Sequence, residues 1–146
     1  MKKFLLTVAV VAMTAGAAIA SSDTENKLVT VVTSPDAQTQ LMAMVLTMQA
    51  AQQGAKAHIM LCGPAGDLAL KDAPQNATAG QPPLDLSPQG LMQMVREKTG
   101  TTVEVCALYL PGKGADPSVL LDGIGVAKPP EMAARLMDDD TRVLNY

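Results

Sequence analysis

Residues 101–112, which read TTVEVCALYLPG, decide the fold class of this chain. The first half is rich in β-branched residues and predicts a buried β-strand that delivers Cys106 to its end. The second half predicts a short helical turn and a glycine-containing loop. In an α/β sheet, the ligand crevice lies at the carboxyl ends of the strands. Cys106 is therefore expected where it meets solvent and the N-terminus of the next helix, a place suited to sulfur chemistry.

Strand and helix signals alternate outward from this stretch in both directions. The predicted strands are 27–33, 55–62, 101–107, 123–127 and 141–144, and the predicted helices are 35–53, 88–99, 117–121 and 129–137. This alternation implies a parallel sheet with helices on both faces. We find no internal repeat and no domain boundary, so residues 21–146 are expected to form one domain.

The longest predicted helix begins after Ser34, Pro35 and Asp36, which supply a cap, a proline at the first helical position and an acid in the first turn. It ends at Gly54. Its expected apolar face comprises Ala37, Leu41, Met44, Val45, Met48 and Ala51, widened by Met42 and Leu46. A stripe this broad predicts packing against the sheet and leaves room for contact with another subunit.

Residues 64–87 are the least regular part of the chain. They contain four prolines and two glycines, and only residues 66–71 suggest a helical turn. A connection of this length is usually a lid, a binding loop or a disordered insert.

The first 20 residues have the pattern of a secretory signal peptide. Lys2 and Lys3 form a basic start, residues 4–17 are almost wholly apolar, and Ala18 and Ala20 give the small-x-small pattern of a cleavage site. We expect cleavage before Ser21, export to the periplasm, and no membrane association after cleavage, because no other run is apolar enough to span a bilayer.

Charge and composition exclude nucleic acid as a partner. Loss of Lys2 and Lys3 changes the formal charge from −3 to −5, because the signal contains no acid. An acidic chain is a poor ligand for nucleic acid or anionic lipid. Tyr109 and Tyr146 are the only aromatic residues left after residue 20, so bases would have no stacking platform.

Cys62 and Cys106 are the two cysteines of the chain, and both are predicted at strand ends. In an oxidising compartment they are expected to form a disulfide if their strands are neighbours. If no disulfide forms, Cys106 is either a reactive thiolate or an inert buried thiol. In that case Cys62 is either a resolving thiol or a small packed apolar residue.

The order and spacing of several segments resemble the DsrE/DsrF-like family. The resemblance extends from residue 27 to residue 146 and depends on the long helix, the strand ending at residues 62–63, and the runs 27–34 (KLVTVVTS), 103–106 (VEVC), 121–124 (LDGI) and 130–137 (PEMAARLM). It implies a three-layer α/β/α fold of flavodoxin-like appearance, with a mostly parallel five-stranded sheet, and assembly into trimers or hexamers.

The same resemblance implies a function for one cysteine. Relatives in sulfur relays carry a persulfide on the cysteine before the glycine loop, and the matching residue here is Cys106. The resemblance assigns no role to Cys62. Relay members are cytoplasmic and several have a basic segment after the cysteine, whereas residues 107–115 contain only Lys113.

Other chemistries have weaker support. His58, the only histidine, lies in a predicted apolar strand and is expected to be a hydrogen-bonded structural residue. The methionines raise a copper hypothesis, but most fall on apolar helix faces, where methionine is an ordinary filler. Residues 138–140 (DDD) are read as a solvated helix end. No phosphate loop, dinucleotide fingerprint or zinc pattern occurs, so we predict no cofactor and no metal.

The sequence thus favours an exported sulfur carrier or sulfur-relay protein that accepts sulfane sulfur on Cys106 and exchanges it with a donor or acceptor protein. The alternative is a non-catalytic oligomeric binding module that uses residues 64–87. Copper handling is the third candidate.

Overall fold

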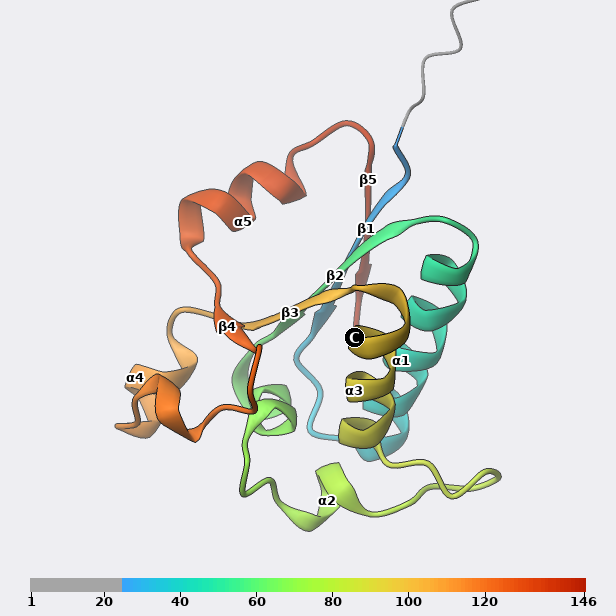
Figure 1. Cartoon of the computed structure of the whole chain (residues 1–146). Coiled ribbons are helices and arrows are strands. Elements are labelled where there is room, and N and C mark those ends of the chain that lie inside the picture. Colours follow the sequence, from blue (N-terminus) through green and yellow to red (C-terminus); the bar gives the residue numbers. More distant parts are fainter. Residues whose placement is uncertain (1–24) are drawn as a thin grey trace, which may run out of the picture.

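The computed structural model describes residues 25–146, and the predicted signal peptide lies outside them. Five parallel strands form one sheet in the order β4-β3-β2-β1-β5 (Figure 1). The strands are β1 (Lys27–Val32), β2 (Lys56–Leu61), β3 (Thr102–Val105), β4 (Gly125–Val126) and β5 (Thr141–Asn145). The predicted five-stranded α/β fold is confirmed, and the sheet is parallel throughout.

Helices connect the consecutive strands, and their positions are close to those predicted from the sequence. They are α1 (Ala37–Gln52), η1 (Gly63–Ala69), α2 (Gln75–Thr78), α3 (Pro88–Thr99), α4 (Tyr109–Lys113), η2 (Pro117–Val119) and α5 (Pro129–Leu136), where η marks a 3-10 helix. The expected boundaries of α3 are confirmed. The Ser87 side chain accepts a hydrogen bond from the Gly90 N–H, and Gly100 ends the helix with φ +69°.

The start of α1 differs from the prediction. Asp36 is the N-cap, and its carboxylate accepts hydrogen bonds from the backbone N–H and hydroxyl of Thr39, both at 2.8 Å. Ser34 and Pro35 precede the helix, so Pro35 is not its first residue and no acid occupies its first turn. The carboxylate of Asp36 reaches the free N–H groups of the first turn, which a cap at Ser34 would leave unpaired.

Helices α1 and α3 pack together on one face of the sheet and enclose the larger core. Its largest fully buried apolar side chains are Met44, Ile59, Leu61, Leu68 and Met92. Methionine fills the volume that aromatic residues occupy in other cores.

The buried face of α1 is rotated from the predicted stripe. Gln40, Ala43 and Thr47 are buried, whereas Met42 and Leu46 are exposed. Both polar residues make hydrogen bonds, although Oε1 of Gln40 has no partner among the described residues. Gln40 donates to the Ser34 carbonyl at 2.8 Å, and the Thr47 hydroxyl lies 2.7 Å from the hydroxyl of Thr30 on β1.

Helix α5 lies alone on the opposite face of the sheet (Figure 1). Its buried contacts form a small second core of Val29, Ala127 and Met132. Part of this face therefore stays open, between α5 and the amino ends of the central strands.

Residues 64–87 are more ordered than the sequence suggested. They include most of η1, which is largely buried, and the short helix α2. Isolated bridges pair Leu70 with Leu120 and Gln81 with Leu86. Within residues 25–146, no helix has the length and apolar character needed to cross a membrane.

Candidate functional site

The two cysteines lie side by side at the carboxyl edge of the sheet. Strands β2 and β3 are neighbours, and their last register pair is Leu61 opposite Val105. Cys62 and Cys106 follow directly, and the Cys106 N–H donates to the Leu61 carbonyl at 2.9 Å. The sequence placed both cysteines at strand ends, and the strand order makes those ends adjacent.

Cys62 and Cys106 are free thiols, not the disulfide expected for neighbouring strand ends, and both residues are half-buried. Burial, and next its interaction with the Cys106 thiol, raise the pKa of Cys62 to about 12. Cys62 therefore keeps its proton at neutral pH.

A cavity of about 600 Å³ adjoins the pair. Its lining residues are Gly63, Pro64, Asp67, Cys106, Leu108, Tyr109, Gly112 and Lys113. Cys106 lines this cavity and Cys62 does not. The two thiols therefore differ in access, because a ligand in this cavity would meet Cys106 and not Cys62.

Asp67, Tyr109 and Lys113 form a hydrogen-bonded cluster in the wall of this cavity. The Tyr109 hydroxyl donates to Oδ1 of Asp67 at 2.6 Å, and Nζ of Lys113 lies 2.8 Å from the same oxygen. Nζ of Lys113 also lies 5.5 Å from the centre of the Tyr109 ring. The cluster links η1 to α4 and so fixes the shape of the wall.

The cluster also sets the charge beside Cys106. Burial acts to raise the pKa of Asp67, but hydrogen bonds from Lys113 and Tyr109 outweigh it and hold that pKa below its usual value. Burial and the bond to Asp67 raise the pKa of Tyr109, so the phenol stays protonated. The Lys113 charge is thereby matched by Asp67, and the wall is close to neutral.

The prediction that Cys106 meets the N-terminus of the next helix is wrong. Helix α4 has five residues and begins at Tyr109, after an N-cap residue, Leu108, that makes no side-chain cap. The N–H of Tyr109 donates to the backbone carbonyl of Cys106 at 2.9 Å, so this first N–H of α4 is already paired.

Sequence reasoning did not single out Asp67 or Tyr109 as part of the site. The available signal was compositional, since Tyr109 is one of two aromatic residues after the signal peptide. Its pairing with Asp67 spans 42 positions and depends on the packing of η1 against α4.

Gly66 is required for this arrangement, because a Cβ there would overlap the ring of Tyr109. We expect Gly66→Ala to lower the free energy of unfolding by about 1–3 kcal/mol, since either the ring or η1 must shift. Urea unfolding measures this. Gly112→Ala is the matched control, because a Cβ at Gly112 meets nothing within 4 Å and Gly112 lines the same cavity. Equal stability of the two variants would contradict the assignment.

The remaining candidates lie away from this cavity. Asp138 forms an ion pair with Lys27 at 2.7 Å, so residues 138–140 are not simply a solvated run. Met44, Met48, Met92 and Met132 are buried in the two cores. Within the described residues, no group of three His, Cys, Asp or Glu side chains is arranged to hold a metal.

His58 is buried, as expected, but it is not hydrogen-bonded as predicted. It is 4% exposed, and neither ring nitrogen has a hydrogen-bond partner among the described residues. Oε2 of Glu104 lies 3.1 Å from Nε2, outside hydrogen-bonding geometry. His58 lies at the amino side of the sheet, and the structure does not bring it to the cysteines.

Comparisons with known proteins show the fold alone. No protein-family model and no curated protein matches the chain. Among solved structures, the YchN protein of E. coli is similar with a TM-score of 0.64 and 15% identity, over 84% of this chain and 99% of that one. Protein MTH1491 of Methanobacterium thermoautotrophicum, described as of unknown function, is similar with a TM-score of 0.61 and 13% identity, over 84% and 100%. The chain therefore shares the fold of these two proteins.

Proposed function

We propose that the protein is an exported sulfur carrier that accepts sulfane sulfur as a persulfide on Cys106. The observation that supports it best is the asymmetry of the cysteine pair. Cys106 lines the cavity, whereas Cys62 does not line it and keeps its proton at neutral pH. A carrier needs one accessible nucleophilic sulfur, and this pair supplies one.

Loading is a displacement at sulfur. The Cys106 thiolate attacks the outer sulfur of a donor persulfide, the new S–S bond forms on Cys106, and the donor leaves as its thiolate. Delivery is the same step in reverse order, with an acceptor thiolate attacking the outer sulfur and Cys106 leaving. No net oxidation occurs in either step.

The wall of the cavity suggests the kind of donor. The Lys113 charge is matched by Asp67, and the remaining lining is mostly apolar. Leu108, at the rim, is 80% exposed. This neutral, largely apolar wall favours a persulfide presented on a cysteine of a partner protein. A small inorganic anion would need an unpaired cation.

Export to the periplasm and assembly into a trimer or hexamer belong to the same proposal. The pattern of residues 1–20 supports export. The exposed side chains of Met42 and Leu46 on α1 offer an apolar surface that assembly would cover.

Intact mass spectrometry tests the carrier function. After reduction and removal of reductant, incubation with a low-molecular-weight persulfide should increase the mass of the wild-type protein by about 32 Da, one sulfur atom. We expect no increase for Cys106→Ser. Absence of added sulfur on both the wild-type protein and Cys62→Ser, or equal loading of Cys106→Ser, would overturn the proposal.

A binding module without catalysis is the second candidate, and the exposure of Leu108 beside the cavity favours it. It predicts that a partner protein binds equally well to the wild type and to Cys106→Ser. The carrier hypothesis predicts instead that productive exchange of sulfur depends on Cys106.

A further inference from the structure

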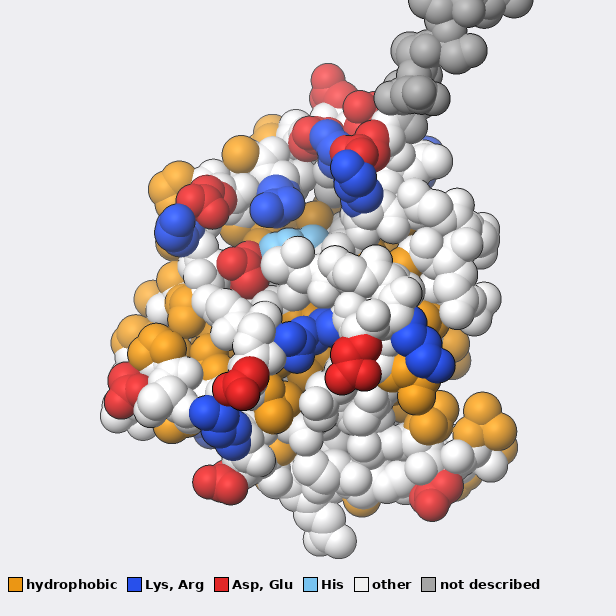
Figure 2. Space-filling model, in the orientation of Figure 1, with side chains coloured by type: hydrophobic (Ala, Val, Ile, Leu, Met, Phe, Trp, Pro, Cys, Tyr) orange, Lys and Arg blue, Asp and Glu red, His pale blue; other side chains and the backbone are white. Residues whose placement is uncertain are grey.

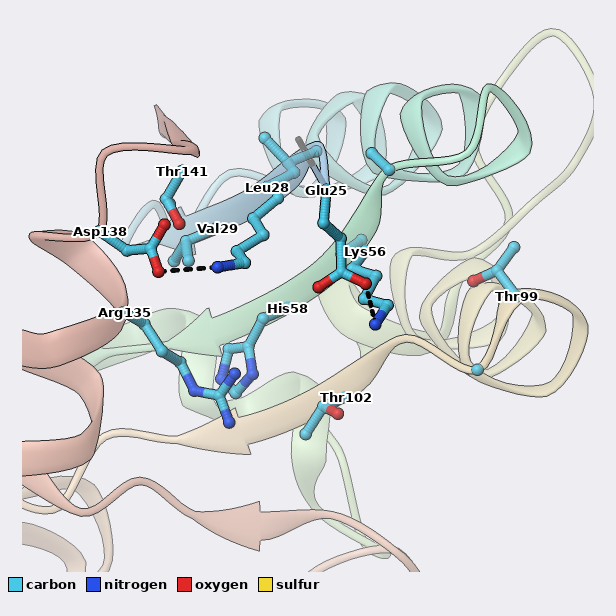
Figure 3. Close-up of a pocket in the computed structure, with 14 residues that line it drawn as sticks. Glu25, Leu28, Val29, Lys56, His58, Thr99, Thr102, Arg135, Asp138 and Thr141 are labelled. Atoms are coloured by element: carbon cyan, nitrogen blue, oxygen red, sulfur yellow. Dashed lines mark hydrogen bonds and ion pairs between the residues drawn. The ribbon is translucent and has the colours of Figure 1, made fainter. Parts of the chain in front are cut away.

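A second cavity, of about 580 Å³, opens at the amino edge of the sheet, at the other end of the strands from the cysteine pair. Lys27, Lys56, Thr102 and Thr141, which line it, are the first residues of β1, β2, β3 and β5. Figure 3 shows Arg135 reaching from α5 into the same space as His58 from β2. This amino-edge cavity is the open part of the face that α5 covers incompletely.

His58 brings unpaired polar atoms to the amino-edge cavity. Its two ring nitrogens are buried without a hydrogen-bond partner. Such atoms normally cost about 1–3 kcal/mol each unless a partner or an ordered molecule satisfies them. In Figure 2 the histidine colour lies in a hollow bordered by acidic and basic side chains.

Of the three cations that line this cavity, only Arg135 has no carboxylate partner among the described residues, and the carboxylate of Glu104 lies 3.1 Å from Nε2 of His58. Lys27 pairs with Asp138 at 2.7 Å and Lys56 pairs with Glu25 (Figure 3). Among residues 25–146, no carboxylate lies within 4 Å of the Arg135 guanidinium. The cavity thus offers a guanidinium with free donors beside an imidazole with free nitrogens.

We infer that the amino-edge cavity binds a small anion through an oxyanion head, held by the guanidinium of Arg135 and an N–H of His58. A guanidinium matches carboxylate and phosphate oxygens with two parallel hydrogen bonds. The hydroxyls of Thr102 and Thr141 are further donors on the cavity wall. The volume suits a small ligand.

The ionisation of His58 is coupled to such binding. Burial, and next the charge of Arg135, lower the pKa of His58 to about 4. Glu104 on β3 contacts the ring, and Lys27 and Lys56 line the cavity on β1 and β2. A bound anion offsets the Arg135 charge, so the pKa of His58 rises in the complex and binding strengthens as pH falls through that raised value.

The single histidine of the chain gives a direct readout. NMR spectra of the imidazole, recorded on protein without a histidine tag at pH 6.5, would be followed during titration with sodium acetate and, separately, inorganic phosphate. We expect a saturable change in the His58 signals and a rise of its pKa toward 6.5. Response to acetate assigns a planar carboxylate head, and response to phosphate assigns a tetrahedral head.

Two arginine variants make the test specific. Arg135→Gln should weaken binding at least about tenfold, because the bidentate donor is lost. Both Arg135 and Arg142 are exposed, so their variants should fold, and Arg142, on β5, does not line the cavity. Arg142→Gln should bind as the wild type does. Failure of both anions to give a saturable change, or equal binding by Arg135→Gln, would overturn the inference.

Discussion

A persulfide on Cys106 is expected to have a shorter lifetime in the wild-type protein than in Cys62→Ser. Neighbouring parallel strands lie about 4.8 Å apart, within the roughly 4.4–6.8 Å between Cα atoms that a disulfide requires. Cys62 and Cys106 directly follow the last register pair of the neighbouring strands β2 and β3, so they occupy adjacent strand ends.

Attack by Cys62 on the inner sulfur would form the Cys62–Cys106 disulfide and release hydrogen sulfide, with the Cys62 proton leaving on the sulfide. The high pKa of Cys62 slows this step, because the thiolate is the attacking form. The reaction should therefore accelerate as pH rises. An acceptor thiol that arrives first would take the sulfur instead.

Sulfide release and thiol counting measure this outcome together. Loaded wild-type protein should release one sulfide per chain and lose both free thiols, whereas loaded Cys62→Ser should keep the added mass and release none without an acceptor. Cys106→Ser, which never loads, is the control for sulfide from residual donor. Equal persulfide lifetimes in the wild type and Cys62→Ser would exclude Cys62 as a resolving thiol.

Lowering the pH from 7.5 to 5 is expected to reduce the free energy of unfolding through His58 by about 2 kcal/mol. The pKa of His58 is lowered from 6.5 to about 4 in the folded protein, chiefly by burial. As the pH is lowered, the unfolded chain therefore binds a proton before the folded protein does. The free energy of unfolding decreases as the pH is lowered from 6.5 to 4. Above pH 6.5 both states are neutral and the effect is absent.

Asp36, Asp67, Asp116 and Asp138 do not account for a change in this range. Hydrogen bonds hold their pKa values below the usual range, so their contribution to stability is lost only at lower pH. Urea unfolding in a cationic buffer, free of carboxylate and phosphate, measures the His58 effect. His58→Gln should show little change between the two pH values, and a loss equal to that of the wild type would contradict this assignment.

Local sequence signals predicted the elements of this fold well. Ser87, Pro88 and Gly100 mark the ends of α3 correctly, because caps and left-handed glycines depend on a few adjacent residues. The buried face of α1 was predicted less well. Gln40 and Thr47 are buried and hydrogen-bond to Ser34 and Thr30 outside the helix, and those partners cannot be read from helical periodicity.

The α/β class, the alternation of strands and helices, and the positions of Cys62 and Cys106 at strand ends can all be read from the sequence. Three features required the folded structure: β2 and β3 are neighbours, Cys106 lines a cavity that Cys62 does not, and Asp67 and Tyr109 belong to its wall. Strand order is the reason. Hydrogen bonds between parallel strands join residues far apart in the chain, whereas periodicity and capping report only on neighbours within a few positions.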